Sequence, residues 1–312
     1  MVHSHEHHHE HVHELTSLNK SFIIGITLNI LFVLVEFGIG FYYDSLGLLS
    51  DAGHNLGDVA SLVLAMLAFR LAKVHPNSRY TYGYKKSTVL VSLLNAVILL
   101  VAVGIIVTES VEKLFHPVPV EGAAIAWTAG VGVVINAITA WLFMKDKEKD
   151  LNVKGAYLHM AADTLVSVGV VISGIVIMYT GWTIVDPIIG LVIAVIIVIS
   201  TWGLLHDSLR LSLDGVPVGI DSGRIGQVIL EQSGVEGYHH LHIWALSTTE
   251  TALTAHIVIN DLRRMEEVKH KIKNELAHAG VSHVTLEFEY KGACCEGHDR
   301  TGCIPSRGRK YS

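Results

Sequence analysis

Long apolar runs separated by short polar loops dominate residues 21–210 of this chain. A helix advances about 1.5 Å per residue, so runs of about 20 apolar residues can cross the ~30 Å hydrocarbon layer of a bilayer. Six runs meet this length, at Phe22–Tyr43, Leu46–Leu71, Thr88–Val111, Gly122–Met144, Val153–Tyr179 and Ile184–Leu205. The pattern therefore predicts an all-α domain of six transmembrane helices.

After residue 210 the apolar positions become sparser, and shorter amphipathic segments follow. A helix is predicted over Asp221–Gln232, then the strands "YHHLHIWAL" and "ETALTAHIVI", a second helix over Met265–Ala279 and a last strand, "VSHVTLEFEY". This αββαβ order predicts a small α+β domain over residues 211–290, with its helices on one face of a sheet. Residues 291–312 are rich in glycine and charge, and they are predicted to be disordered.

The composition agrees with a membrane protein, because 50% of the residues are hydrophobic, 17% are charged and the mean hydropathy is +0.45. The net charge of −6 comes with no basic region, which argues against nucleic acid as a partner. Lysine and arginine gather in the loops after the second and fourth runs. The positive-inside rule then predicts that both termini are cytoplasmic.

Both ends of the chain carry potential metal ligands. Residues 1–20 are predicted to form a His-rich cytoplasmic arm. Its first part, "MVHSHEHHHEHVHE" at residues 1–14, is predicted to be disordered and able to bind divalent metal weakly, although a solvated tail without a role is the alternative. The tail holds Cys294, Cys295, His298 and Cys303. These side chains either collect zinc or copper(I) or are simply reactive thiols in a reducing compartment, where disulfides are not expected.

Ionisable side chains interrupt the second and fifth apolar runs at matching positions. His54 and Asp58 in "HNLGD" are four residues apart, as are His159 and Asp163 in "HMAAD". This spacing stacks the two side chains on one helix face, about 6 Å apart along the axis. Each ionisable residue in a transmembrane span raises the free energy of membrane insertion by about 2.5–3.5 kcal/mol, so the pairs require partners or a function.

The second and fifth runs cross the bilayer in opposite directions. Packed side by side, they would bring His54 level with Asp163 and Asp58 level with His159. Two imidazoles and two carboxylates suit tetrahedral Zn²⁺, whereas Mg²⁺ and Ca²⁺ prefer six or more oxygens. With four protein ligands no position remains for water, which favours transport over catalysis. Asp51, one turn before His54, either attracts cations at the outer mouth or caps the helix.

A lone polar residue in a membrane span more often forms a packing hydrogen bond than a metal site. We expect this structural role for four further side chains in the spans, Asn29, Glu36, Asn95 and Asn136.

The motifs "SDAGHNLGD", "HMAADTLVSVGVVISG" and "GVEGYHHLHIWAL" resemble those of the cation diffusion facilitator family, and the resemblance covers nearly the whole chain. It implies a homodimer in the bilayer of a bacterial inner membrane that exports Zn²⁺, and also Co²⁺, Cd²⁺ or Fe²⁺, in exchange for protons by alternating access. The transport ligands of the family fall on His54, Asp58, His159 and Asp163. Histidine at the first of these positions is associated in the family with zinc over cadmium.

The resemblance also implies a ferredoxin-like cytoplasmic domain with a βαββαβ core and, in some members, bound zinc at the dimer contact. His239, His256 and His270 match histidines of that site, while Glu287 and Glu289 stand where the family has His and Asp. Ordinary surface histidines are the alternative.

Two further expectations come from the resemblance. Lys86 and Asp214 match a charged pair that locks the two subunits near the inner membrane surface. Tyr80 and Tyr84 replace histidines of a loop metal site found in some members, so no metal is expected there.

Two other functions remain open from the sequence. A membrane-embedded zinc hydrolase would use the same residues, with Asp51 as the candidate base. A metal sensor would signal through its soluble domain and use the spans only as an anchor.

Overall fold

The computed structural model describes residues 9–42, 46–116, 123–182 and 184–290. Within these ranges the structure describes only the backbone of residues 9–19, 40, 46–51, 53–54 and 123–129, and of several residues from 170 to 186. The chain divides into two compact units, Met1–Ser208 and Leu209–Ser312, and each is described by itself.

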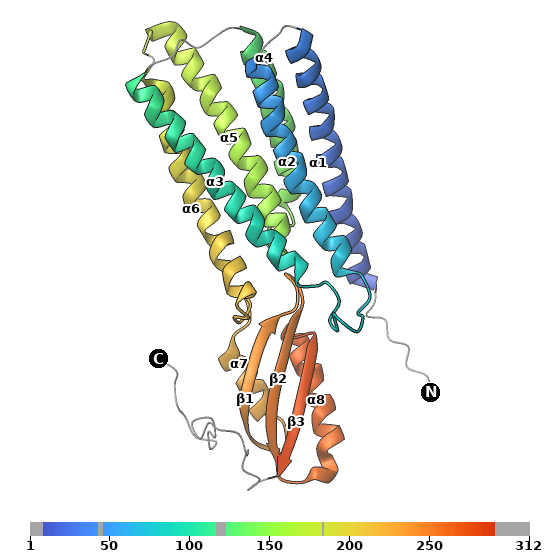
Figure 1. Ribbon diagram of the computed structural model, residues 1–312. Helices are drawn as coiled ribbons and strands as arrows, with labels where there is room; N and C mark the ends of the chain where they lie inside the picture. Colours follow the sequence, from blue (N-terminus) through green and yellow to red (C-terminus); the bar gives the residue numbers. More distant parts are fainter. Residues whose placement is uncertain (1–8, 43–45, 117–122, 183, 291–312) are drawn as a thin grey trace. The chain divides into compact units, whose positions relative to one another are not determined.

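Six long helices form the first unit in the described part of the chain, and they run side by side in Figure 1. Their bounds are α1 His9–Tyr42, α2 Leu46–Ala72, α3 Ser87–Phe115, α4 Ala123–Met144, α5 Leu151–Thr180 and α6 Val185–Ser212. The prediction of a disordered segment over residues 1–14 is wrong for residues 9–14, which belong to the start of α1 at residues 9–20. No proline or glycine interrupts this stretch, and its Glu and Leu residues favour helix. Residues 1–8 lie outside the described part.

Within the described residues, four helices are long and apolar enough to cross a membrane, with spans at Lys20–Ile39, Asn55–Ala72, Ser87–Phe115 and Pro187–Ser212. The apolar part of α4 that the structure describes, Gly130–Met144, is shorter. α5, which carries His159 and Asp163, is not among the four. Length and composition thus support a helical membrane domain, and the predicted count of six spans is confirmed only for these four.

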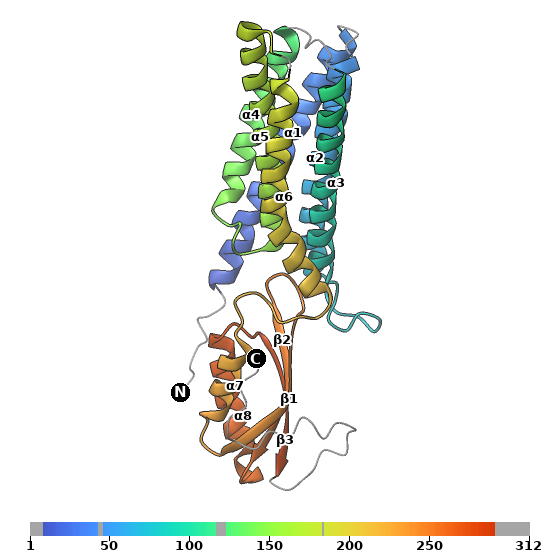
Figure 2. The same cartoon turned by 90° about the vertical axis from the view of Figure 1, so that its left-hand side faces the viewer.

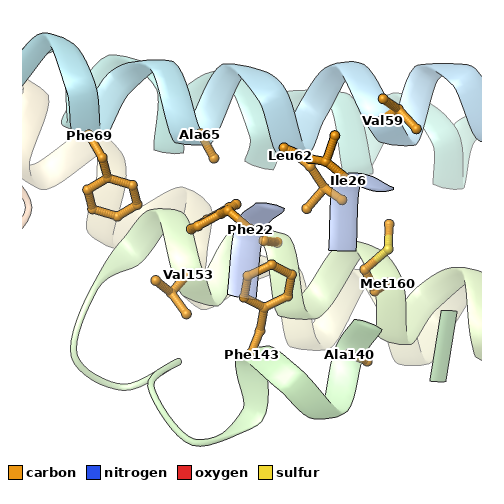
Figure 3. Close-up of a cluster of buried hydrophobic side chains, with 11 residues drawn as sticks. Phe22, Ile26, Val59, Leu62, Ala65, Phe69, Ala140, Phe143, Val153 and Met160 are labelled. Atoms are coloured by element: carbon orange, nitrogen blue, oxygen red, sulfur yellow. The ribbon is translucent and has the colours of Figure 1, made fainter. Parts of the chain in front are cut away.

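A buried cluster fixes α2 and α5 against α1 and α4, as Figure 3 shows. Phe22 of α1 lies at its centre, with ring centroids 5.7 Å from Phe69 of α2 and 4.8 Å from Phe143 of α4. Such tilted aromatic pairs contribute about 0.5–1.5 kcal/mol beyond the burial of their area. Val59 and Met160, which directly follow Asp58 and His159 in the sequence, belong to the same cluster, so it positions those polar side chains.

A second apolar cluster joins α3, α5 and α6, and polar contacts link helices elsewhere. The buried amide of Asn29 donates to Thr139 Oγ1 of α4 at 3.2 Å, and the buried Asn55 amide of α2 donates to Glu36 of α1 at 2.7 Å. These bonds confirm the expected packing role of Asn29 and Glu36. Asn95 and Asn136 are buried as well.

The second unit has the predicted αββαβ order. Its elements are α7 Ser222–Leu230, β1 Val235–Ala245, β2 Thr251–Ile259, the short 3₁₀ turn η1 Leu262–Arg264, α8 Met265–His278 and β3 His283–Tyr290. The described residues form a sheet in the order β1-β2-β3, antiparallel between β1 and β2 and parallel between β2 and β3. This confirms an α+β domain, but the fourth strand of a βαββαβ core is not among the described residues.

Both helices of the second unit cover the same face of the sheet (Figure 2). Leu253 and Ile257 of β2 are buried against Ile229 of α7 and Ile272 of α8 in one apolar cluster. Because side chains alternate along a strand, His256 of β2 points to the opposite face. We call this second side, which the two helices leave uncovered within the unit, the open face.

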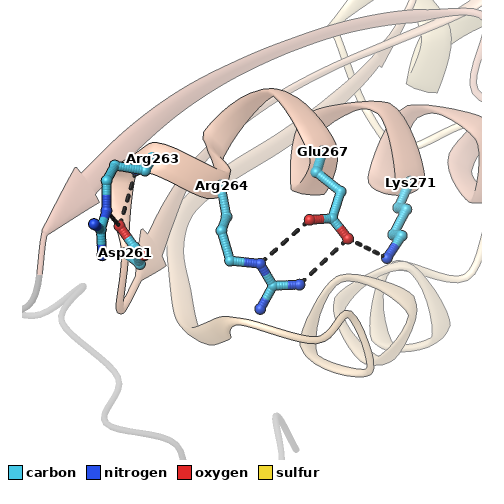
Figure 4. Close-up of polar contacts among 5 residues, drawn as sticks. All are labelled: Asp261, Arg263, Arg264, Glu267 and Lys271. Atoms are coloured by element: carbon cyan, nitrogen blue, oxygen red, sulfur yellow. Dashed lines mark hydrogen bonds and ion pairs between the residues drawn. The ribbon is translucent and has the colours of Figure 1, made fainter.

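The start of α8 carries an exposed network of charges (Figure 4). Arg264 donates to Glu267 through Nε at 3.2 Å and Nη2 at 3.3 Å, and Lys271 Nζ approaches the same carboxylate at 2.7 Å. These hydrogen bonds, those from Arg264 first, lower the pKa of Glu267 to about 2. The network thus favours the ionised carboxylate and supports the first turns of α8.

Candidate metal transport site

Three of the four predicted intramembrane ligands converge between α2 and α5. His159 Nε2 lies 2.7 Å from Asp58 Oδ1 and 3.9 Å from Asp163 Oδ2. One ligand atom from each of Asp58, His159 and Asp163 lies within 4.8 Å of the others. A divalent ion placed among them could reach all three after small side-chain adjustments, because zinc ligands sit about 2.0–2.2 Å from the metal.

The convergence follows from the helix repeat and the packing of the two helices. His159 and Asp163 are one turn apart on α5, so both project from the same face. Asp58 and His159 are 2% and 7% exposed, and the Asp163 side chain is 13% exposed. Two carboxylates this deeply withdrawn from water and this close together favour a cation as their partner.

The side chains of the remaining predicted members of this site lie outside the described part of the chain. The backbones of Asp51 and His54 belong to α2, and His54 precedes Asp58 by one helical turn. Its place as the fourth ligand, and that of Asp51 at the outer mouth, remain predictions.

Asn55, which directly follows His54, is a further polar residue near the site that the sequence pattern did not indicate. Its amide connects α2 to the fully buried Glu36 of α1 at 2.7 Å, close along the helix to the predicted ligands. The signal that could have revealed it was a second polar residue on the same turn as a predicted metal ligand.

A second group of potential metal ligands lies on the open face of the sheet in the second unit. Glu289 of β3 binds two imidazoles, His239 Nε2 of β1 at 3.0 Å and His256 Nδ1 of β2 at 2.6 Å. Nε2 of His256 also lies 3.5 Å from Glu287. His239, His256 and Glu289 place one ligand atom each within 4.8 Å of the others, so strand pairing assembles residues that are distant in the sequence.

His270 does not belong to this group. It lies on the exposed side of α8, and α8 packs through Val268, Ile272 and Leu276 on the face of the sheet opposite His256. Within one subunit His270 therefore does not reach the cluster, and its expected role at the contact between two subunits stays a prediction. Matching by sequence position could not reveal this, because it does not say which face of the sheet α8 covers.

The remaining expectations are not decided by the structure. Lys86, before α3, and Asp214, after α6, belong to different units, so their pairing stays a prediction. The rings of Tyr80 and Tyr84 pack on each other with centroids 4.7 Å apart, and the expected lack of metal in that loop also remains a prediction. Cys294, Cys295, His298 and Cys303 lie outside the described residues.

Two family models match the chain in succession. The cation efflux transmembrane domain covers residues 22–211, well over half of the chain, and the cytoplasmic domain of cation efflux proteins covers residues 217–290. The first range contains all four predicted transport ligands, and the second contains the cluster on the open face.

Curated relatives are similar over nearly their full length. The chain is 35% identical to zinc transporter ZitB of Escherichia coli over 96% of this chain and 95% of that protein. It is 34% identical to the cadmium, cobalt and zinc/H⁺-K⁺ antiporter of Bacillus subtilis, with 88% of each chain covered. It is also 36% identical to the metal cation efflux system protein CzcD of Cupriavidus metallidurans, over 90% of this chain and 89% of that protein. The chain therefore belongs to the cation diffusion facilitator family, whose members are metal efflux transporters and not enzymes.

Proposed function

We propose that this protein is a proton-coupled antiporter that exports Zn²⁺ from the cytoplasm by alternating access. The observation that carries the proposal is the buried contact of His159 with Asp58 and Asp163 between two helices of the membrane domain. The relatives support it, because the Escherichia coli protein is named a zinc transporter and the Bacillus subtilis protein is named a cadmium, cobalt and zinc/H⁺-K⁺ antiporter. Co²⁺, Cd²⁺ and Fe²⁺ are further candidate substrates. Neither the hydrolase nor the sensor hypothesis gains support from these relatives.

Proton coupling follows from the chemistry of the ligands. Zinc binds neutral imidazole and ionised carboxylate, so loading the site releases protons, and protonation of the same atoms expels the metal. The bond between His159 Nε2 and Asp58 Oδ1 marks a place where a proton lies when no metal is bound. Metal and proton therefore compete for the same atoms, and in this arrangement two anions need not cross the bilayer uncompensated.

The proposed membrane arrangement has six spans, α1 to α6, in the inner membrane of a bacterium, with both termini in the cytoplasm. The described apolar stretch of α4 and the packing of α5 against α4 and α2 support adding these two helices to the four long apolar ones. The distribution of positive charge between the loops supports the orientation.

The second unit is proposed to be a ferredoxin-like cytoplasmic domain through which the protein forms a homodimer. Its match to the cytoplasmic domain of cation efflux proteins supports this role. His239, His256 and Glu289 are proposed to bind Zn²⁺ there, with Glu287 beside them. A metal bound only by the folded domain would stabilise it, so the site could report the cytoplasmic zinc level.

The test is zinc flux into sealed proteoliposomes that hold the purified full-length protein and a zinc-sensitive dye. An acidic lumen should drive Zn²⁺ inward, and the flux should fall when an ionophore dissipates the pH gradient. Competition with Co²⁺, Cd²⁺ and Fe²⁺ would rank the substrates. Flux that is absent, or that ignores the pH gradient, would contradict the proposal. A hydrolase should move no metal.

A further inference from the structure

A β-bulge interrupts β1 within the sequence "YHHLH". His239 pairs with His256 and His242 pairs with Thr254, so two residues of β1, His240 and Leu241, stand opposite one residue of β2. His240 has a φ of 49°, and Asp214 is the other described residue besides glycine with positive φ. For a non-glycine residue this conformation costs on the order of 1–3 kcal/mol, and such strain tends to occur at functional sites.

The bulge changes the direction in which His240 points. In an uninterrupted strand, neighbouring residues point to opposite faces, so His240 would enter the apolar side beneath α7 and α8. Instead Leu241 packs against the apolar cluster, and the ring of His240 lies beside those of His239 and His256. Bulges are known devices for re-aiming a side chain in this way.

The three rings form a nearly equilateral triangle. Their centroids are 5.1 Å apart for His239 and His240, 5.0 Å for His239 and His256, and 5.1 Å for His240 and His256. With Zn–N bonds of about 2.0–2.1 Å, a ring centre lies about 3.2 Å from the metal, so two rings at a tetrahedral angle have centres about 5.2 Å apart. The triangle thus has the size that a zinc ion with three histidine ligands requires.

We infer that His239, His240, His256 and Glu289 bind one transition-metal ion, Zn²⁺ by preference, and that a single subunit supplies all four ligands. The inference rests on the proposed metal binding by His239, His256 and Glu289, and it adds His240 as the fourth ligand. Only His239, His256 and Glu289 place ligand atoms within 4.8 Å of one another as they stand, so His240 would join them by rotation of its ring about the side-chain bonds. His270 of the same subunit cannot join this set, since it lies on the other side of the sheet.

The donor set defines the class of ligand. Three imidazole nitrogens and one carboxylate suit Zn²⁺ or Co²⁺ and disfavour Mg²⁺ and Ca²⁺, which need more oxygens. Glu289 now holds two imidazoles, through Oε2 and Oε1. Metal would replace these hydrogen bonds with coordination, and Glu287, 3.5 Å from His256, would supply the second negative charge nearby.

The test is metal binding to the purified full-length protein, with Co²⁺ as an optical probe and Zn²⁺ as its competitor. Four-coordinate Co²⁺ absorbs visible light far more strongly than the six-coordinate aquo ion. All variants carry Asp58→Asn, which weakens the transmembrane site. The decisive variant is His240→Gly, because glycine accepts the positive φ and keeps the bulge while it removes the imidazole.

His240→Gly should weaken Zn²⁺ binding at the cytoplasmic site at least about tenfold and reduce the four-coordinate Co²⁺ spectrum, since the loss even of residues that only support a ligand costs about 10–100-fold. Glu289→Gln should weaken binding similarly. His242→Ala and His270→Ala are the matched controls and should keep the affinity of the Asp58→Asn parent, without the loss of about tenfold or more expected when a group that acts on the metal is removed.

The outcomes separate this inference from the proposals on which it builds. Wild-type affinity in His240→Gly together with weak binding in Glu289→Gln would overturn the role of His240 and leave the three-residue site. Unchanged binding in both variants would overturn the cytoplasmic site itself. A loss in His270→Ala equal to that in His240→Gly would contradict a site made by one subunit. The vesicle flux of each variant, measured without Asp58→Asn, tests the transport proposal independently.

Discussion

His159 Nε2 of α5 lies 2.7 Å from Asp58 Oδ1 of α2, and both side chains are almost completely buried. The two residues are 101 positions apart in the sequence. In the proposed mechanism this contact makes the pair the place where proton and metal compete, because a proton between nitrogen and oxygen and a metal bound by them exclude each other.

Replacement of Asp58 by asparagine should abolish most zinc transport while the helices remain packed. The amide keeps the shape and can still bond to His159, but it loses the negative charge that offsets a dication. We expect zinc flux in proteoliposomes to fall at least about tenfold.

Asp207→Asn provides a matched control for this substitution. Asp207 lies on α6 and pairs with Lys154 of α5 at 3.6 Å, with both side chains partly exposed. Its loss removes only a screened ion pair, so flux should stay near that of the wild type. Equal flux from Asp58→Asn and the wild type would refute the assignment of Asp58 as a ligand.

The metal preference should depend on position 54. Replacement of His54 by aspartate exchanges a nitrogen ligand for an oxygen. The family resemblance predicts that the transport of cadmium then increases relative to that of zinc. We expect the ratio of Cd²⁺ to Zn²⁺ flux to rise on the order of tenfold, since replacing a group that acts on the metal changes affinity by about 10–100-fold. Competitive uptake of the two metals at equal concentration measures the ratio. An unchanged ratio would contradict the predicted role of His54.

The close approach of α1 to α4 should be sensitive to a single methyl group at Gly25. A Cβ there would lie 2.9 Å from Thr139 Cγ2. Thr139 cannot simply rotate away, since its hydroxyl accepts a hydrogen bond from Asn29 and donates one to the Ile135 carbonyl. Gly25→Ala should therefore destabilise the membrane domain by about 1–3 kcal/mol, the usual cost of overpacking.

Gly104→Ala in α3 is the control for this prediction, because no atom lies within 4 Å of a Cβ at that position. Thermal unfolding of both variants in the same detergent gives the comparison. An unfolding midpoint for Gly25→Ala equal to or above that of Gly104→Ala would contradict the prediction, because it would show that α1 and α4 accommodate the added methyl group at no cost in stability.

The charge network on α8 should make a pH-dependent contribution to stability. The pKa of Glu267 is about 2 in the folded protein, against an ordinary value of 4.5, because Arg264 and Lys271 bond to its ionised form. A lowered folded-state pKa stabilises the protein above the unfolded-state pKa, and this stabilisation is lost as the pH falls from about 4.5 toward 2.

Glu267→Gln should therefore lower the unfolding midpoint slightly at pH 7, and its difference from the wild type should shrink as the medium is acidified below pH 4.5. Salt should also reduce the difference, since the network is exposed. Glu275→Gln, another exposed glutamate of α8, is the control. A difference that grows on acidification would have the wrong sign for this mechanism.

Local patterns were sufficient to predict several features. The apolar runs located α1 to α6 within a few residues except for the start of α1 and the end of α6, and alternation and turn signals gave the αββαβ order. The four-residue spacing of His159 and Asp163 placed both on one helix face. These features follow from the 3.6-residue repeat of the helix and the two-residue repeat of the strand, which the sequence displays directly.

The tertiary structure decided which faces meet. The contact of Asp58 with His159 depends on how α2 packs on α5, and the separation of His270 from His256 depends on which side of the sheet α8 covers. The bulge that turns His240 toward His239 and His256 depends on the register between two strands. Neighbours along the chain fix a residue's direction relative to its own helix or strand, whereas packing between distant segments fixes what it touches.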